Sequence, residues 1–272
     1  MIKILIEKIL GKIGYEIRPI KRGHSFPDGE SRAFPENFVQ AAMLGFLVQK
    51  SQITILQIGA NDGKVNDPIF NFCQKYKNET FVVLIEPQVL VAKKLRENYK
   101  SHPNANIIIE AFGDGRPITL YSVKPEFWSQ LEIPYASDWP DYRAATGVTS
   151  EIESHIVSWL VKYGSFTHDS ASDAIEKTVY PTITTESICE KYPECQNLDL
   201  LQVDVEGADD RVTRLVLDAG VRPFLINFES FHLSQDNLEA FVMYLQSKGY
   251  ECFTRNKDTF CVLRFTHDKS ML

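Results

Sequence analysis

Apolar residues in this chain fall into short β-branched runs that alternate with segments of helical spacing. Continuous apolar runs of about four to eight residues indicate buried strands. They predict strands at residues 53–58, 81–86, 106–110, 118–123, 198–207 and 224–229, and a closing hairpin formed by 250–254 and 259–265. Strands that alternate with helices are typical of an α/β fold with a largely parallel sheet.

Helical spacing fills most of the intervals between these strands. We expect helices at residues 36–48, 67–78, 88–100, 150–163, 209–219 and 234–249. Three of them begin with capping signals: Asp67 before Pro68, Ser150 three residues before Glu153 as a capping box, and Ser234. His155 lies at the edge of its helix's apolar stripe, which favours a structural role.

The N-terminal segment has the spacing of an amphipathic helix over residues 2–13. About twelve residues are too few for a bilayer, which needs about twenty. We expect this helix to dock on the body or on a second subunit, so a homo-oligomer stays open; peripheral membrane contact is the alternative. The predicted organisation is a segment of helix, loop and packing helix at 1–50 and a main domain at 51–272, with an insertion at 124–178.

A glycine turn follows the first strand, in the sequence Gln57-Ile58-Gly59-Ala60-Asn61-Asp62-Gly63-Lys64. Glycine permits unusual backbone angles and a close approach by a ligand. Val65 after Lys64 excludes a Walker phosphate loop, and Asn61 and Lys64 stand where a dinucleotide fingerprint needs glycine or alanine. The Asp62 carboxylate favours a cationic, phosphate-free ligand such as S-adenosylmethionine. An ordinary strand-to-helix turn is the alternative.

The second and third predicted strands also end in acidic turns. Glu86 precedes Pro87 about twenty residues beyond the glycine turn, where a carboxylate can accept both hydroxyl protons of a ribose. A solvated strand end is the alternative for Glu86. The third strand leads to Gly113 and Asp114, which we expect near an adenine.

Four candidate catalytic residues follow the fourth and fifth predicted strands: Asp204, Glu206, Glu229 and His232. Alternation along a strand predicts that Asp204 and Glu206 lie on the same side. Two carboxylates on one face need a partner, so they indicate a cationic ligand, a metal or a proton acceptor.

All three tryptophans of the chain fall between residues 124 and 178, together with several tyrosines and phenylalanines. Aromatic faces stack on sugar rings and other flat apolar surfaces, so this insertion is a candidate binding region for an acceptor. Aromatic rings that merely anchor the insertion to the core are the alternative.

Composition narrows the class of protein. The net charge of −7 and the pI near 5.5 argue against a nucleic-acid partner, which needs dense lysine and arginine. The five cysteines are odd in number and form no CxxC pair, which favours reduced thiols in the cytoplasm. At 272 residues we expect one main α/β domain.

With these motifs, the chain resembles the FkbM family of class I S-adenosylmethionine-dependent methyltransferases. The resemblance covers roughly residues 52–265 and rests on five stretches: Gln57–Gly63, Ile85-Glu86-Pro87, Ala111–Asp114, the Asp-x-Glu-Gly element in Val203–Asp209, and Asn227–Glu229. Asp209 and Gln202 depart from the residues usual there. The aromatic insertion is particular to this chain.

The resemblance implies a Rossmann-like, mostly parallel seven-stranded sheet with a C-terminal antiparallel hairpin and helices on both faces. It implies S-adenosylmethionine as cofactor, bound by Gln57, Gly59, Ala60, Asn61, Asp62, Gly63, Glu86, Pro87, Gly113, Asp114 and Asp204. It also implies O-methylation, often of sugars in polysaccharides, glycolipids or secondary metabolites, so the partner is a small-molecule or glycan acceptor.

Three alternatives stay open at the level of sequence. A divalent cation held by Asp204, Glu206 and His232 is a less favoured mechanism. A catalytically inactive scaffold in a glycan-assembly complex would keep the fold without the chemistry. An NAD-dependent oxidoreductase is disfavoured by the missing second and third glycines.

Overall fold

A computed structural model describes residues 38–255 and 257–264. The helix expected at residues 2–13 and the loop expected at 21–35 therefore lie outside the described residues. No helix in the described part is long and apolar enough to cross a membrane.

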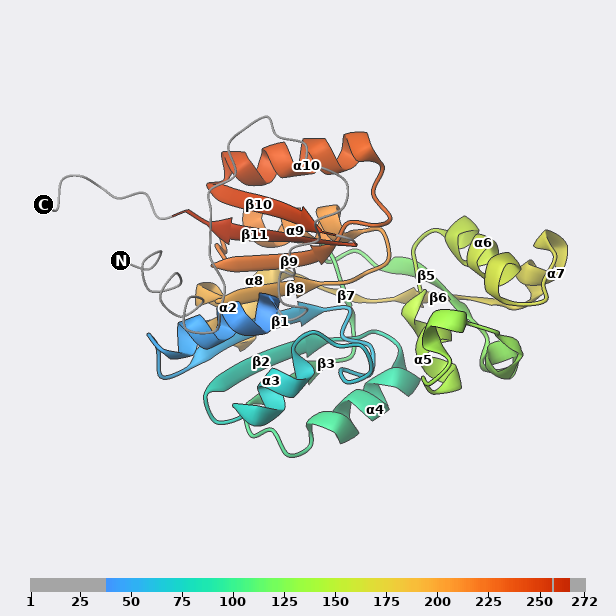
Figure 1. Cartoon of the computed structure of the whole chain (residues 1–272), viewed down its shortest axis with the longest axis horizontal. Coiled ribbons are helices and arrows are strands. Elements are labelled where there is room, and N and C mark those ends of the chain that lie inside the picture. The colour runs from blue at the N-terminus through green and yellow to red at the C-terminus, as the bar shows by residue number, and fades with distance from the viewer. Residues whose placement is uncertain (1–37, 256, 265–272) are drawn as a thin grey trace, which may run out of the picture.

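The centre of the molecule is a seven-stranded sheet in the order β10-β11-β9-β8-β1-β2-β3 (Figure 1). Its strands are β1 Ile53–Ile58, β2 Thr80–Ile85, β3 Ala105–Ile108, β8 Leu200–Val203, β9 Leu225–Glu229, β10 Tyr250–Arg255 and β11 Asp258–Leu263. β3, β2, β1, β8 and β9 pair in parallel, while β11 is antiparallel to both β9 and β10. The expected mostly parallel sheet with a C-terminal antiparallel hairpin is confirmed.

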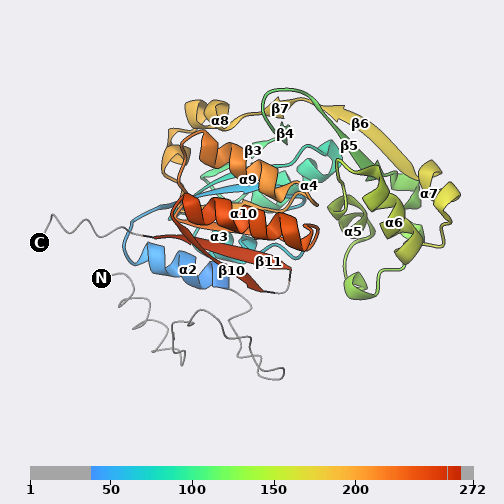
Figure 2. The same cartoon turned by 90° about the horizontal axis from the view of Figure 1, so that it is seen from above.

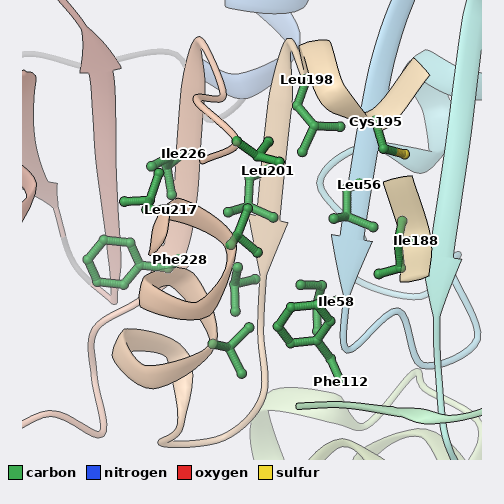
Figure 3. Packing of buried hydrophobic residues seen from close by; sticks show 14 of the residues in the cluster. Leu56, Ile58, Phe112, Ile188, Cys195, Leu198, Leu201, Leu217, Ile226 and Phe228 are labelled. Carbon is green, nitrogen blue, oxygen red and sulfur yellow. The ribbon is translucent and has the colours of Figure 1, made fainter. Parts of the chain in front are cut away.

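Two groups of helices cover the two faces of this sheet. The helices are α2 Phe38–Leu47, α3 Phe70–Lys75, α4 Val89–Tyr99, α8 Thr185–Lys191, α9 Asp209–Asp218 and α10 Gln235–Ser247. In β1, Ile53 and Ile55 face the core under α2, α3 and α4, whereas Leu56 and Ile58 face the core under α8, α9 and α10 (Figure 3). This alternation explains why the strand is apolar throughout.

The region between β5 (Ile118–Val123) and β6 (Ile175–Tyr180) forms a separate body at one end of the sheet (Figure 2). β5 and β6 pair with each other in an antiparallel ribbon. Between them lie η1 Pro125–Gln130, η2 Pro134–Ala136, α5 Asp141–Gly147, α6 Glu153–Tyr163 and α7 His168–Asp173. Ile156 and Leu160 of α6 are fully buried in a third hydrophobic cluster that belongs to this region.

Two short pieces and a 3-10 turn complete the fold. β4 (Ala111–Phe112) pairs with β7 (Thr182–Ile183), which brings the chain back to the sheet after the ribbon. η3 (Pro193–Asn197) then leads into β8.

Two helix starts differ from the prediction. Helix α6 begins at Glu153 with Ile152 at the N-cap, so the capping box predicted for Ser150 is wrong. Ser150 is paired with Tyr121 of β5 and its hydroxyl is used elsewhere. Helix α3 spans Phe70–Lys75. It begins later than predicted because Asp67 accepts the amides of Ile69 and Phe70 in a turn that precedes the helix. Ser234 caps α10 as expected.

Candidate active site

The carboxyl ends of β1, β2, β8 and β9 meet at one edge of the sheet, as the ends of parallel strands do. The glycine turn follows β1, Glu86 follows β2, Asp204 to Gly207 follow β8, and Glu229 ends β9. The sheet therefore gathers most of the candidate residues along one edge.

The glycine turn is left-handed at Gly59 (φ 81°), Asn61 (φ 47°) and Gly63 (φ 62°). A Cβ at Gly59 would overlap the carbonyl oxygen of Asp204, and one at Gly63 would overlap a methyl of Leu95. Sequence analysis assigned the space at these glycines to a ligand, but in the structure the protein's own atoms fill it. Gly59 brings the β1 turn directly against the end of β8, and Gly63 brings it against α4.

Glu86 ties the glycine turn to the second strand. Its side chain is buried, and its two oxygens accept the amides of Asn61 and Gln88, each at 2.9 Å. Burial raises the pKa of Glu86 to about 7, against the lowering effect of these hydrogen bonds. Each carboxylate oxygen has a second lone pair, so Glu86 can still accept hydroxyl donors. Pro87 lies between Glu86 and the start of α4.

Asp62 is enclosed by the protein itself. Its Oδ1 accepts the amides of Lys64 (2.9 Å) and Val65 (3.0 Å), and its Oδ2 accepts the hydroxyl of Tyr142 at 2.8 Å. Arg143 Nε lies 3.9 Å from Oδ1. In this structure the Asp62 carboxylate is therefore satisfied by groups of the turn and of the insertion.

Helix α5 of the insertion covers the glycine turn. Asn61 Nδ2 donates to Thr146 Oγ1 (3.1 Å), Gln88 Nε2 to the Thr146 carbonyl (3.1 Å), and Arg143 Nε to the Val65 carbonyl (3.1 Å). No motif or spacing in the sequence connects residues 142–146 with the turn, so sequence analysis missed this contact.

Two residues expected at the cofactor pack in the interior. Gln57 is buried within β1 and donates to Asp67 Oδ2 at 2.7 Å, while Ala60 belongs to the core under α2, α3 and α4. Their expected part in cofactor binding stays a prediction.

The turn at Gly113 and Asp114 lies apart from the acids after β8 and β9. Asp114 is partly exposed and pairs with Arg116 of the same turn, whose hydrogen bonds lower the pKa of Asp114 to about 2. A Cβ on Gly113 would lie 2.8 Å from Thr182 Cγ2, so the glycine allows close packing with β7.

Glu206, Glu229 and His232 form a compact cluster, which we call the acid–histidine cluster. His232 Nε2 lies 2.8 Å from Glu206 Oε2 and 3.4 Å from Glu229 Oε2. The side chains are 28% exposed for His232, 22% for Glu206 and 15% for Glu229, so solvent and small molecules can reach them. The structure brings together three of the four residues predicted to be catalytic.

Asp204 reaches this neighbourhood by a different route from the one predicted. β8 ends at Val203 and Glu206 adopts a left-handed backbone (φ 52°), so strand alternation does not relate Asp204 to Glu206 and that argument is wrong. As a residue Asp204 is exposed to solvent. Neighbouring protein atoms that partly withdraw its carboxyl group from water, and repulsion from Glu206 and Glu229, raise the pKa of Asp204 well above its usual range.

The pKa values of two members of the acid–histidine cluster, Glu229 and His232, are raised. Burial, followed by repulsion from Glu206, raises the pKa of Glu229 to about 7. The hydrogen bond to Glu206 raises the pKa of His232. Groups that exchange protons near neutral pH are suited to general acid–base chemistry.

Sequence analysis missed two further neighbours of this cluster. Ser150 Oγ donates to the Glu206 carbonyl at 3.0 Å, and the His155 ring stacks on His232 with centroids 5.7 Å apart. A groove of about 270 Å³ runs beside them, between residues 150–152 and the start of α9. The position of His155 at the edge of an apolar stripe predicts a structural role. The spacing of Ser150 and Glu153 predicts a helix cap, not a contact with the site.

Besides burial, the charges of Glu229 and Glu206 also act on Asp209 and contribute to raising its pKa. It is buried, its Oδ2 accepts the Gly207 amide at 3.3 Å, and burial raises its pKa to about 7. The resemblance to the FkbM family marks Asp209 only as a departure from the residue usual at that position.

The aromatic residues of the insertion divide into two groups. Some anchor it: Trp128 Nε1 donates to the Val123 carbonyl, and Phe127 packs on Phe166. A second set packs ring against ring nearer the surface, in edge-to-face and tilted pairs. Its members are Tyr135, Trp139, Trp159 and Tyr163. Tyr135 is 54% exposed, and its hydroxyl accepts a hydrogen bond from Trp159. Trp159 lies one turn along α6 from His155, the residue that stacks on His232. This set therefore lies near the acid–histidine cluster.

Comparison with known proteins gives one strong match. The model of the methyltransferase FkbM domain matches residues 57–252. No curated protein matches the chain.

Solved structures give weak likenesses. The SAH-bound methyltransferase PaMTH1 of Podospora anserina has 13% sequence identity and a TM-score of 0.39, over 88% of this chain and 83% of that one. A precorrin-6y C5,15-methyltransferase from Geobacter metallireducens has 12% identity and a TM-score of 0.39, over 86% of this chain and 90% of that one. At these scores the structures add no argument to the family match.

Proposed function

Because this chain belongs to the FkbM methyltransferase family, and is thus an S-adenosylmethionine-dependent methyltransferase, we propose that it methylates a hydroxyl group. The acceptor is a sugar in a glycan, a glycolipid or a secondary metabolite. The observation that carries this proposal is the acid–histidine cluster at the carboxyl edge of the sheet, which offers acceptors for a hydroxyl proton.

The residues at this edge fit a cationic cofactor. Glu86 is a buried carboxylate with lone pairs left for a ribose, and Asp204 is one of four acids gathered after β8 and β9. We assign ribose binding to Glu86 and cofactor or acceptor positioning to Asp204, with the backbone of residues 59–63 as the cradle. When bound, S-adenosylmethionine supplies an electrophilic methyl group on a sulfonium.

An alcohol is a weak nucleophile until its proton leaves, so a base within hydrogen-bond reach is needed. The Glu206–His232 pair, 2.8 Å apart, takes this proton, and Glu229 keeps the imidazole between two carboxylates. Stacking on His155 holds the ring of His232 in place. Alignment of the acceptor against the methyl group supplies the remaining rate enhancement.

The test of this mechanism uses Glu206→Gln and His232→Ala. We expect turnover to fall about 100-fold or more in each, the usual range for general base catalysis, with the affinity for S-adenosylmethionine unchanged by calorimetric titration. The hydrogen bond to Glu206 raises the pKa of His232. In Glu206→Gln this effect is lost, so the acid limb of the pH–rate profile should move to lower pH.

His168→Ala is the matched control, because His168 is exposed at the start of α7. Full turnover in both cluster variants at saturating cofactor would remove these residues from the chemistry. Failure of the wild-type protein to bind S-adenosylmethionine would refute the proposed function itself.

We assign acceptor binding to the insertion, within the main domain that we place at residues 51–272. Tyr135, Trp139, Trp159 and Tyr163 lie near the acid–histidine cluster, and aromatic faces suit sugar rings. We expect Trp159→Ala to raise KM for the acceptor with little change in kcat. Trp128→Ala, in the anchoring group, should instead lower the stability of the insertion.

We also place the protein in the cytoplasm. All five cysteines are free, and Cys73, Cys195 and Cys261 are buried. Fractionation of cells that express the protein tests this placement.

A further inference from the structure

The three side chains of the acid–histidine cluster are arranged like the ligands of a metal ion. One ligand atom from each of Glu206, Glu229 and His232 lies within 4.8 Å of the other two. The residues come from the loop after β8, the end of β9 and the turn that follows β9, so the fold of the sheet edge brings them together.

The spacing of the ligand atoms suits octahedral coordination. Bonds of about 2.1 Å put adjacent ligand atoms about 3 Å apart and opposite ones about 4 Å apart. The observed separations are 2.8 Å for Glu206 Oε2 to His232 Nε2 and 3.4 Å for His232 Nε2 to Glu229 Oε2. The ligand atoms of Glu206 and Glu229 lie within 4.8 Å of each other, so a small ion can bind all three atoms after rotation of these side chains.

Glu229 supplies an independent sign of a missing ligand. Its Oε2 is buried and accepts no hydrogen bond within the described part of the chain. A buried carboxylate oxygen without a partner is costly, and a bound cation would satisfy it. Lys257 Nζ is 3.9 Å from the other oxygen, Oε1, whereas Oε2 faces His232 Nε2 at 3.4 Å without accepting a hydrogen bond from it.

We propose that Glu206, Glu229 and His232 bind one divalent cation of the Mn²⁺ or Mg²⁺ type. Two carboxylates and one imidazole are a donor set for such ions. The partly exposed side of the cluster leaves coordination positions open for acceptor oxygens. The less favoured cation site considered from the sequence comprised Asp204, Glu206 and His232, and the proposed site has Glu229 in place of Asp204.

This site deepens the proposed function and rests on it for its role. The cation and the proton on His232 compete for the same lone pair, so they exclude each other. In the cation-loaded protein the ion lowers the pKa of the acceptor hydroxyl, whereas in the metal-free protein the Glu206–His232 pair takes the proton.

The test titrates the full chain with MnCl₂ and follows the electron paramagnetic resonance signal of free Mn²⁺, with calorimetry as a second readout. We expect one Mn²⁺ per chain, and at least a tenfold weaker affinity in Glu229→Gln and in Glu206→Gln. Glu190→Gln is the matched control, because Glu190 is an exposed carboxylate on α8. Circular dichroism establishes that each variant is folded.

Equal Mn²⁺ binding by wild type, Glu229→Gln and Glu206→Gln, or no binding at millimolar Mn²⁺, would overturn the site. Titration of the same metal-free samples with S-adenosylmethionine separates this result from the proposed function. Cofactor binding without Mn²⁺ binding refutes the cation site alone, whereas Mn²⁺ binding without cofactor binding refutes the methyltransferase proposal and leaves the cation site standing.

Discussion

At the scale of single residues, Glu206 has the most unusual backbone in the site. Of the described non-glycine residues with positive φ, two are asparagines and the third is Glu206. Asparagine tolerates this region, but a glutamate there is held at a cost of about 1–3 kcal/mol. The hydrogen bond from Ser150 to the Glu206 carbonyl helps to hold it. A strained residue that points a carboxylate at His232 is consistent with a role in chemistry.

The effect of burial on the Glu86 carboxyl group can be tested through the pH dependence of stability. Its pKa of about 7 exceeds the ordinary 4.5, so the folded state binds its proton more tightly than the unfolded state does. Stability is therefore lost as pH rises from about 4.5 to about 7, by at most about 3 kcal/mol. In Glu86→Gln this loss is absent, so the unfolding free energy of wild type minus that of the variant should fall as pH rises from about 4.5 to about 7.

Urea denaturation at several pH values measures this difference, with S-adenosylmethionine absent. Glu194→Gln, at an exposed position in η3, is the control and should show a flat difference. A flat difference for Glu86→Gln as well would show that Glu86 is ionised in the folded protein at no cost.

At the scale of elements, the contact between the β1 turn and the end of β8 decides the geometry of the site. Gly59→Ala would place a methyl on the Asp204 carbonyl oxygen at φ 81°, so we expect a loss of at least about 3 kcal/mol. Gly220→Ala has a similar φ of 92° with nothing within 4 Å and should cost about 1–2 kcal/mol. Chemical denaturation compares the two, and equal losses would show that backbone strain alone matters.

Helix α5 gives a second test at this scale. Tyr142→Phe removes the hydroxyl that donates to Asp62, and we expect a cost of about 1 kcal/mol and faster amide exchange in residues 141–147. Hydrogen exchange followed by mass spectrometry measures this. Unchanged exchange in α5 would mean that Arg143 and Thr146 hold the helix without Tyr142.

At the scale of the whole molecule, the central sheet could be predicted because its strands are buried on both faces. Residues of β1 and β2 such as Ile55 and Val83 form continuous apolar runs that stand out in the sequence. β6 was missed because it is a surface strand, with Glu176 and Lys177 exposed. Burial, which makes a strand visible in a sequence, is absent there.

The candidate site could be predicted only in part for a related reason. Glu206, Glu229 and His232 follow recognisable strands, so their shared edge could be expected from the sequence. The contacts of Tyr142 with Asp62 and of Ser150 with Glu206 join residues 80 and 56 positions apart. They depend on how the insertion folds back, which no local pattern encodes.

The β5–β6 ribbon joins the insertion to the rest of the chain as a part with its own hydrophobic cluster. It tethers the insertion at two adjacent strands, and the hydrophobic cluster inside shares no member with the two clusters that flank the sheet. A foreign segment spliced between Val123 and Ile175 would leave those two clusters intact. Such a chimaera would lose the contacts of Tyr142 with Asp62 and of Ser150 with Glu206 unless the incoming segment replaces them. It therefore tests whether the insertion sets the proposed acceptor preference.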